Sequence, residues 1–224
     1  MSLFDQLVDQ ALARQQALVS LRTVMEKELL HRDIFRVLSQ AGLLAQLVFI
    51  GGTCLRACYG SSRLSEDLDF TGGADFNRES LSTMSQALVL SLQDKYGLVV
   101  NVTEPSHEES NVVIWRIKVQ TRPARRDMPA QRIHIDVCSA PSYRPRPMVL
   151  LNAYGVDVGT RGLIVQAQSR EEIFVDKLVA FALCPNKIKN RDLWDIVCLH
   201  QGSVKPALEL LPRKLTDHRA DRHH

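Results

Sequence analysis

The 224-residue sequence lacks several features that would place it in a specialised class of protein. No uninterrupted apolar run approaches the roughly 20 residues that are needed to cross a bilayer. The N-terminal stretch MSLFDQLVDQALARQQ carries Asp5 and Asp9 and has no continuous hydrophobic segment of the kind found in secretory signals. Repeats and low-complexity tracts are also absent from the sequence. We therefore expect a soluble, cytoplasmic protein with no membrane partner.

Cysteine pairs and strong charge are lacking as well. The five cysteines show no CxxC or Cys/His spacing typical of zinc sites, so we expect reduced thiols that act as small core residues; they are Cys54, Cys58, Cys138, Cys184 and Cys198. The net charge of +3 is slight, so a polyanion has to be met by a local patch. The basic clusters Arg122–Arg126, Arg144–Arg146 and Lys187–Arg191 are candidates to contact RNA phosphates, although such runs are more often solvated loops.

The composition is 45% hydrophobic, which is ordinary for a globular chain with one sizeable domain or two small ones. Apolar periodicity predicts one or two helices over Leu3–Ser39, followed by helices at Thr53–Tyr59, Arg78–Tyr96, Ser169–Leu183 and Asn190–His200. Strands are predicted at Leu47–Ile50, Leu64–Phe70, Leu98–Val102, Val112–Gln120 and Arg132–Val137.

Two boundaries follow from local composition. The proline-rich stretch Pro141–Pro147 predicts a break in regular structure and is the best candidate linker. We therefore expect a core over residues 1–140, with its N-terminal helices, and a mostly helical part over residues 141–224. In that second part, Ser169 and Glu172 form a capping-box signature, and the polar tail LTDHRADRHH is expected to be frayed.

The stretch FIGGTCLRACYGSSRLSEDLDF, residues 49–70, crowds a glycine pair and an acidic pair into one segment. Period-two alternation over Leu64–Phe70 sends Asp67 and Asp69 to the same face of a strand. The strand RIHIDV adds Asp136, which shares a face with His134. Three carboxylates on neighbouring strands suit hard cations such as Mg²⁺, which prefer oxygen ligands.

The glycine pair is consistent with a phosphate site beside these carboxylates. Gly51 and Gly52 lack a Cβ and let the backbone approach an anion, and the N–H groups at the start of the following helix point toward it. Thr53 can donate its hydroxyl at the same place. Taken alone, a Gly-Gly pair is more often a tight turn and an acidic pair is more often a solvated strand face; their combination within one short span favours a functional site.

The segments GGTCLRACYG, RLSEDLDF, IHIDV, REEIFVDKLVAF and KNRDLWDIVCL resemble, in order and spacing, the AbiEii-type nucleotidyltransferases, the toxin components of type IV toxin–antitoxin and abortive-infection systems, which include the MenT toxins. The resemblance covers about Glu26 to Leu199. It implies an α+β (mixed α/β) DNA polymerase β-like nucleotidyltransferase fold, a mixed sheet flanked by helices with a helical C-terminal part.

The resemblance also implies roles for individual residues. Asp67, Asp69 and Asp136 are the expected catalytic and metal-binding carboxylates, with Mg²⁺ as the expected ion and Mn²⁺ as the alternative. Lys177 is an expected catalytic and phosphate-contacting residue, although a lysine in a helix edge also serves to cover the core. The remaining expected nucleotide contacts are Gly51, Gly52, Thr53, Arg56, Arg63, Ser65, Asp192 and Asp195. A salt bridge to Arg191 or Lys189 is the alternative for each of the last two. For Arg63 the alternative is a surface loop position.

The leading hypothesis is a toxin that transfers a nucleoside monophosphate from an NTP to an acceptor. By analogy with the MenT branch, the acceptor is the 3′ end of tRNA, so that translation and growth stop, and a cognate antitoxin is an expected partner. A second hypothesis is a kinase-like phosphotransferase acting on a protein or a small molecule. A third is a non-catalytic partner that binds nucleotide or antitoxin. The sequence does not discriminate between NTPs and does not define the oligomeric state.

Overall fold

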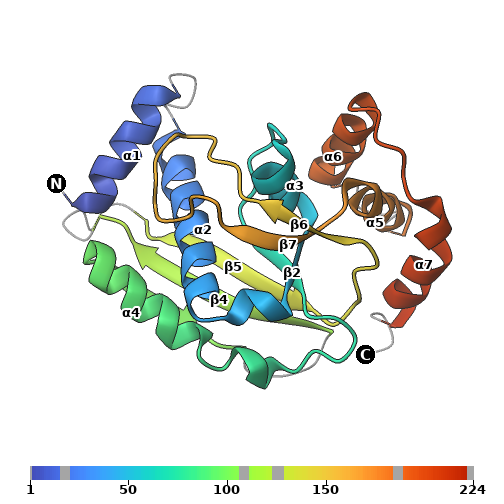
Figure 1. Ribbon diagram of the computed structural model, residues 1–224, viewed down its shortest axis with the longest axis horizontal. Helices are drawn as coiled ribbons and strands as arrows, with labels where there is room; N and C mark the ends of the chain where they lie inside the picture. The colour runs from blue at the N-terminus through green and yellow to red at the C-terminus, as the bar shows by residue number, and fades with distance from the viewer. Residues whose placement is uncertain (1, 16–20, 106–110, 123–128, 184–188, 221–224) are drawn as a thin grey trace.

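The computed structural model of the protein describes residues 2–15, 21–105, 111–122, 129–183 and 189–220. In these ranges, seven strands form one mixed sheet in the order β3-β4-β5-β2-β1-β7-β6, with helices packed around it (Figure 1). The predicted class, a mixed sheet flanked by helices, is confirmed. The division into parts 1–140 and 141–224 stays a prediction, and the second part contributes two strands to the same sheet as the first.

The sheet combines parallel and antiparallel pairs. β1 pairs antiparallel with β2 and parallel with β7, while β2 runs parallel to β5. β4 lies antiparallel between β3 and β5, and β6 pairs antiparallel with β7. The strands are β1 (Val48–Ile50), β2 (Leu68–Thr71), β3 (Val99–Thr103), β4 (Val112–Gln120), β5 (Gln131–Cys138), β6 (Pro145–Val149) and β7 (Ile164–Gln168).

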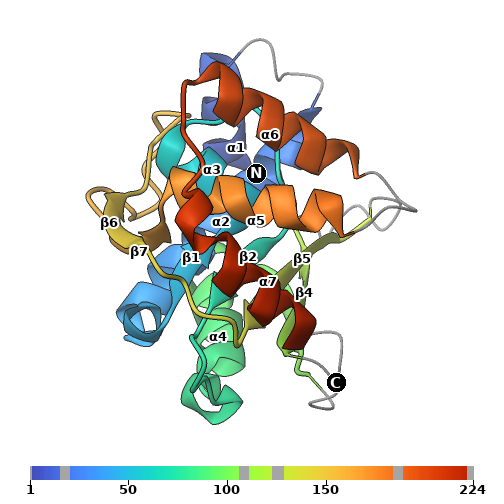
Figure 2. The same ribbon diagram turned by 90° about the vertical axis from the view of Figure 1, so that its right-hand side faces the viewer.

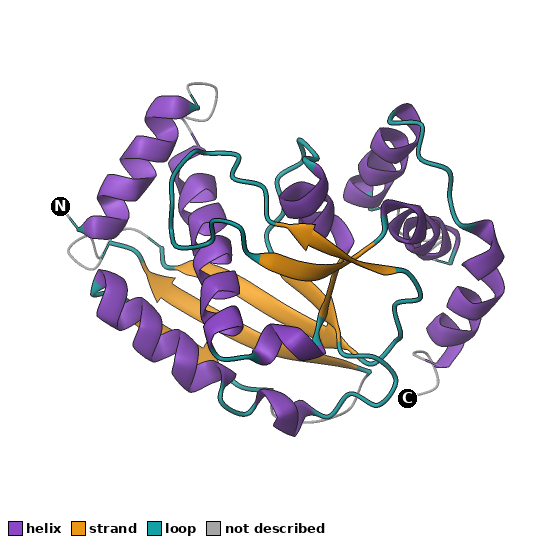
Figure 3. Ribbon diagram, viewed as in Figure 1, coloured by secondary structure: helices purple, strands orange, loops and turns teal. Residues whose placement is uncertain are grey.

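The helices fall into two groups (Figures 1 and 3). One group lies toward the N-terminal side and the other gathers near the C-terminus, where α5 contacts both α6 and α7 (Figure 2). The α-helices are α1 (Leu3–Arg14), α2 (Arg22–Gln40), α3 (Gly51–Tyr59), α4 (Met84–Tyr96), α5 (Arg170–Ala182), α6 (Asn190–Gln201) and α7 (Leu211–Ala220). Short 3₁₀ helices lie at Leu43–Gln46, Arg78–Leu81 and Leu208–Leu210.

An aromatic cluster joins α2 to the two central strands that lead to the acidic residues. The rings of Phe35 and Phe49 lie 4.7 Å apart between centroids, and those of Phe49 and Phe70 lie 5.3 Å apart. All three side chains are buried, and each such pair contributes about 0.5–1.5 kcal/mol beyond the burial of area. Because side chains alternate along a strand, Leu68 and Phe70 face this core while Asp69 faces the other way.

Two predicted elements differ at their starts. β2 begins at Leu68 rather than Leu64. The carboxylate of Asp67 accepts a hydrogen bond from the N–H of His134, and the carbonyl of Asp67 accepts one from the Thr53 hydroxyl. The hydrogen bonds between strands therefore do not continue to residues before Leu68. The helix expected over residues 78–96 is divided into a 3₁₀ helix, capped by Asn77, and α4. Its predicted end at Gly97 is confirmed.

The linker expected at Pro141–Pro147 is wrong from Pro145 onward, where the chain forms β6. β6 is the last strand of the sheet, and an edge strand tolerates proline because its outward N–H positions need no partner. The strand β7 was not predicted.

Two further expectations about the C-terminal part are corrected. Ser169 caps α5 as predicted, but the carboxylate of Glu172 does not complete a capping box; it accepts from the backbone N–H groups of Tyr143 and Arg144 instead. The tail expected to be frayed is helical through Ala220, as part of α7. Lys214 of α7, just before this tail, is only 8% exposed and lies 2.6 Å from Glu172 Oε1. Residues 221–224 lie outside the described ranges.

Candidate active site

Strand register brings Asp69 and Asp136 together. Ile50 of β1 lies opposite Asp69 of β2, and Asp69 lies opposite Asp136 of β5. Residues paired across neighbouring strands direct their side chains to the same face of the sheet. The two aspartates therefore stand side by side at the point where β1 passes into α3.

Asp67 joins them from the residue just before β2. Its Oδ1 accepts a hydrogen bond of 3.1 Å from the backbone N–H of His134, two residues before Asp136, and lies 3.4 Å from the Nδ1 of the His134 ring. The three aspartates thus lie together, and His134 shares a face with Asp136, as predicted. All three carboxylates line one cavity of about 730 Å³.

The electrostatics of this acidic cluster favour a cation. Burial raises the pKa of Asp69 to about 6, with the neighbouring charges of Asp136 and Asp67 adding to the effect. Burial and the charge of Asp67 also raise the pKa of Asp136. The Oδ1 atom of Asp136 is buried without a hydrogen-bond partner among the described residues. Burying such a polar atom costs free energy unless a ligand binds it. A bound cation would therefore stabilise the ionised carboxylates of the cluster.

The start of α3 forms another wall of the same cavity. Ile50, Gly51 and Gly52 line it, and the first N–H groups of a helix have no partner within the helix and favour anions. Gly51 has a φ of +75°, and a Cβ there would lie 2.8 Å from Asp69 Oδ2. A Cβ at Gly52 would overlap the Arg63 guanidinium. A side chain at Gly51 would therefore be strained and would displace Asp69, and one at Gly52 would displace the guanidinium of Arg63.

A network of ion pairs ties the basic residues of the wall to α6. Arg63 makes a bidentate pair with Asp195, at 2.7 and 2.9 Å. Lys177 of α5 lies 2.6 Å from Asp192 Oδ1 and 3.0 Å from Asp195 Oδ2. Asp195 is 1% exposed and does not itself line the cavity. Asp192 and Asp195 therefore do form salt bridges, but with Lys177 and Arg63 instead of the expected Arg191 or Lys189. These pairs hold Arg63 and Lys177 at the cavity surface.

Besides Asp195, two of the expected nucleotide contacts do not line this cavity. Thr53 is buried, and its hydroxyl is hydrogen bonded to the Asp67 carbonyl and, at 2.6 Å, to the Ser65 hydroxyl. Arg56 pairs with Glu28 at 2.9 Å and belongs to a different cavity, on another side of α3. The structure does not bring Thr53 and Arg56 into the cavity of the aspartates, whereas Ser65 lines both cavities.

Other lining residues were not anticipated as part of the site. Gln168 of β7 and Asp176 of α5 line the cavity and are joined by a hydrogen bond of 2.7 Å. Lys189 and Arg191 line it as well and come from one of the predicted basic clusters. The position of Asp176 next to Lys177 in the sequence was a signal that could have identified it. No sequence signal marked Gln168, because its strand was not predicted. Residues 123–126 and 187–188 of the basic clusters lie outside the described ranges.

Some absences complete the description. Within the described ranges, no group of three or more His, Cys, Asp or Glu side chains is arranged to hold a metal ion on its own. Among the cysteines that the structure describes, Cys54, Cys58 and Cys198 are free thiols, as expected, and Cys54 and Cys58 are buried; Cys184 lies outside these ranges. In the same part of the chain, none of the helices combines the length and the apolar character needed to cross a bilayer.

Comparisons with solved structures place this architecture among nucleotidyltransferase folds. MenT4, a nucleotidyltransferase toxin from Mycobacterium tuberculosis, is 22% identical, with a TM-score of 0.61 over 94% of this chain and 68% of the MenT4 chain. JHP933 from Helicobacter pylori is 23% identical, with a TM-score of 0.53 over 80% of this chain and 66% of the other. At these identities the likeness concerns the fold, and it confirms the nucleotidyltransferase fold expected from the sequence.

A comparison with curated proteins finds no match. The family described as "Nucleotidyl transferase AbiEii toxin, Type IV TA system" matches residues 32–224, which is most of the chain. The match includes the glycine pair, the three aspartates and the ion-pair network of α5 and α6. The chain therefore belongs to the AbiEii family of nucleotidyltransferase toxins of type IV toxin–antitoxin systems.

Proposed function

We propose that this nucleotidyltransferase toxin is Mg²⁺-dependent and transfers a nucleoside monophosphate from an NTP to RNA, with the 3′ end of tRNA as the acceptor. Growth would stop because such tRNAs cannot be aminoacylated. The observation that carries the proposal is the meeting of Asp67, Asp69 and Asp136 in one cavity with the start of α3. We also propose the cytoplasm as its location, and an antitoxin as the partner that relieves its toxicity.

The acidic cluster fits a divalent cation that shares its ligands with the substrate. Mg²⁺ is commonly held by one or two carboxylates together with substrate phosphates and water, which agrees with the absence of a self-sufficient ligand set in the described ranges. Asp67 and Asp69 would hold the ion, and the unpartnered Oδ1 of Asp136 would face it or the acceptor. When bound, the ion neutralises phosphate charge and lowers the pKa of an attacking hydroxyl.

The chain's own residues then have separate tasks. The N–H groups at Gly51 and Gly52 would bind phosphate oxygens, supported by the helix dipole. Arg63 and Lys177, fixed by Asp195 and Asp192, would orient the triphosphate without losing side-chain entropy at binding. Asp136, whose pKa is raised by burial and by Asp67, is suited to accept the proton of the acceptor hydroxyl.

Exposed cations supply the surface on which RNA would lie. Lys189 and Arg191 line the cavity and are exposed, and neither forms an ion pair with another described residue. Exposed basic groups of this kind account for most non-specific affinity for nucleic acid. By contrast, Arg63 and Lys177 are already matched by Asp195 and Asp192. We therefore assign Lys189 and Arg191 to the acceptor and Arg63 and Lys177 to the nucleotide.

The test is incubation of the purified protein with total tRNA, Mg²⁺ and each of the four α-labelled NTPs. We expect label on tRNA and release of pyrophosphate with the wild type, and a loss of at least about 100-fold for Asp69→Asn. Equal labelling by wild type and Asp69→Asn would refute the metal role. Label from γ-labelled ATP with release of ADP would indicate kinase chemistry, and tight NTP binding with no labelled acceptor would indicate a non-catalytic role.

A further inference from the structure

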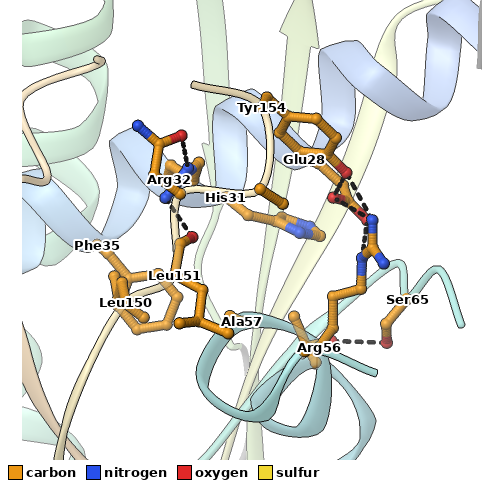
Figure 4. A pocket seen from close by; sticks show the side chains of 14 residues that line it. Glu28, His31, Arg32, Phe35, Arg56, Ala57, Ser65, Leu150, Leu151 and Tyr154 are labelled. Carbon is orange, nitrogen blue, oxygen red and sulfur yellow. Dashed lines mark hydrogen bonds and ion pairs between the residues drawn. The ribbon is translucent and has the colours of Figure 1, made fainter. Parts of the chain in front are cut away.

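A second cavity, of about 280 Å³, lies on another side of α3 from the acidic cluster. Its walls come from α2, from α3 and from the segment that follows β6 (Figure 4). Phe35, Ala57 and Leu150 supply apolar surface, and Glu28, Arg32 and Arg56 supply charge. Nothing in the transfer reaction proposed above uses this cavity.

Arg32 is the unusual member of the lining. It is 8% exposed, and its guanidinium donates to the carbonyl of Leu151 and, at 2.9 Å, to Asn152 Oδ1, both of which are neutral acceptors. No carboxylate of the described residues lies within ion-pair distance of it. A guanidinium has five N–H donors, so three of them remain for a ligand after these two bonds. A buried charge whose partners are only neutral groups is costly, which makes Arg32 a ready partner for an anion.

Burial lowers the pKa of the Arg32 guanidinium and outweighs the opposing charges of Glu28 and Asp157, neither of which forms an ion pair with it among the described residues. The carboxylate of Glu28 is already bound by Arg56 at 2.9 Å and by the Tyr154 hydroxyl. His31 adds no positive charge, because burial lowers its pKa to about 4, and its Nε2 is hydrogen bonded to the Glu66 carbonyl at 3.0 Å. Two guanidinium groups thus share this cavity with one carboxylate.

The volume and the apolar walls indicate the size of the occupant. A cavity of about 150 Å³ lined by apolar side chains holds one benzene ring, so this one accommodates about two fused rings. We infer that the cavity is a binding site for a small carboxylic acid with an apolar, ring-containing body, whose carboxylate pairs with Arg32 and whose body packs on Phe35, Ala57 and Leu150.

Hydrogen bonds connect this cavity to the acidic cluster. Thr53 and Ser65 line this cavity, and the Thr53 hydroxyl is hydrogen bonded to the carbonyl of Asp67. His31 holds the neighbouring carbonyl of Glu66. A ligand that shifts these side chains would therefore change the placement of Asp67 and the affinity for NTP, and by thermodynamic reciprocity NTP would change the affinity for the ligand by the same factor.

Calorimetry with 1-naphthoate as the probe tests the site directly, with 1-naphthalenemethanol as its uncharged analogue. We expect 1-naphthoate to bind the wild type, and Arg32→Gln to weaken that binding about 10- to 100-fold. The alcohol should bind the wild type and Arg32→Gln with equal affinity. The control Arg161→Gln makes the same change of charge at an exposed loop position and should leave both affinities unchanged.

A second variant keeps the test independent of the folding of Arg32→Gln. Ala57→Leu retains Arg32 but fills part of the cavity, so it should weaken both probes. The inference is overturned if 1-naphthoate does not bind the wild type, if Arg32→Gln binds it as tightly as the wild type, or if Ala57→Leu leaves both affinities unchanged. Because binding is measured without turnover, the result does not depend on nucleotidyl transfer.

Discussion

Replacing Gly51 by alanine should both strain the backbone and displace Asp69 in the acidic cluster, and a matched control separates the two effects. Gly51 has a φ of +75°, where a residue with a Cβ costs about 1–2 kcal/mol. Its new Cβ would also lie 2.8 Å from Asp69 Oδ2 and 3.3 Å from Asp69 Cβ. To restore a contact of 3.4 Å, the carboxylate oxygen has to retreat by about 0.6 Å.

The matched control is Gly42→Ala. Gly42 has almost the same φ, +72°, but no atom of the described residues lies within 4 Å of the Cβ position there. Both variants should lose about 1–2 kcal/mol of stability, which lowers the Tm of a chain of this size by about 2–8 °C. Only Gly51→Ala should also lose activity, by about 10- to 100-fold, since misplacement of a catalytic group by up to 1 Å has effects of that order.

The two assays are thermal unfolding followed by circular dichroism and the transfer of α-labelled NTP to tRNA, measured well below the Tm of both variants. The reasoning is refuted if Gly51→Ala and Gly42→Ala retain the same activity. It is also refuted if Gly51→Ala is inactive because it does not fold while Gly42→Ala folds normally, since the strain at the two positions is equal.

Three further predictions concern stability and metal. Lys214→Met removes the cation that pairs with buried Glu172 at 2.6 Å and with Asp176 at 3.1 Å, so urea unfolding should show a loss of about 3–5 kcal/mol; the exposed control Lys205→Met should show none, and equal losses would contradict this account. Burial opposes ionisation of Glu172, but Lys214 and the Tyr143 N–H outweigh it and lower its pKa. The stability that ionised Glu172 adds is therefore present above its unfolded pKa of about 4.5 and is lost as the pH falls through its lower folded pKa. The difference in unfolding free energy between wild type and Glu172→Gln should accordingly shrink in that acid range, not grow. EDTA should abolish label transfer and either Mg²⁺ or Mn²⁺ should restore it, whereas activity that survives chelation would argue against the metal role.

The acidic site could be predicted from sequence because its signal is local. Alternation predicts a shared face for Asp67 and Asp69, although Asp67 lies just before β2 and is placed there by its bond to the His134 N–H. The IHIDV pattern places Asp136 on a buried strand. The glycine pair marks a place of close approach, to Asp69 at Gly51 and to Arg63 at Gly52. What the pattern could not supply was the register that aligns Asp69 with Asp136, because strand pairing depends on contacts between distant segments.

The missed features depend on long-range contacts. Asp195 binds Arg63 across 132 positions of sequence, so no spacing rule connects them. The sequence of α7 is polar, and such a local pattern predicts a frayed tail. The helix is held in place because Lys214 pairs with Glu172 and Asp176 of α5. The strand β6 was missed because its prolines normally interrupt strands, and only its position at the sheet edge makes them acceptable.

Sequencing the 3′ ends of tRNA from cells that express the protein tests the central claim most directly. Wild-type protein should yield tRNAs with added nucleotides at the 3′ end and arrested growth, while Asp69→Asn, produced at the same level, should yield unmodified ends and normal growth. Growth arrest with unchanged tRNA ends, or identical ends with wild type and Asp69→Asn, would contradict the proposed transfer to tRNA by this acidic site.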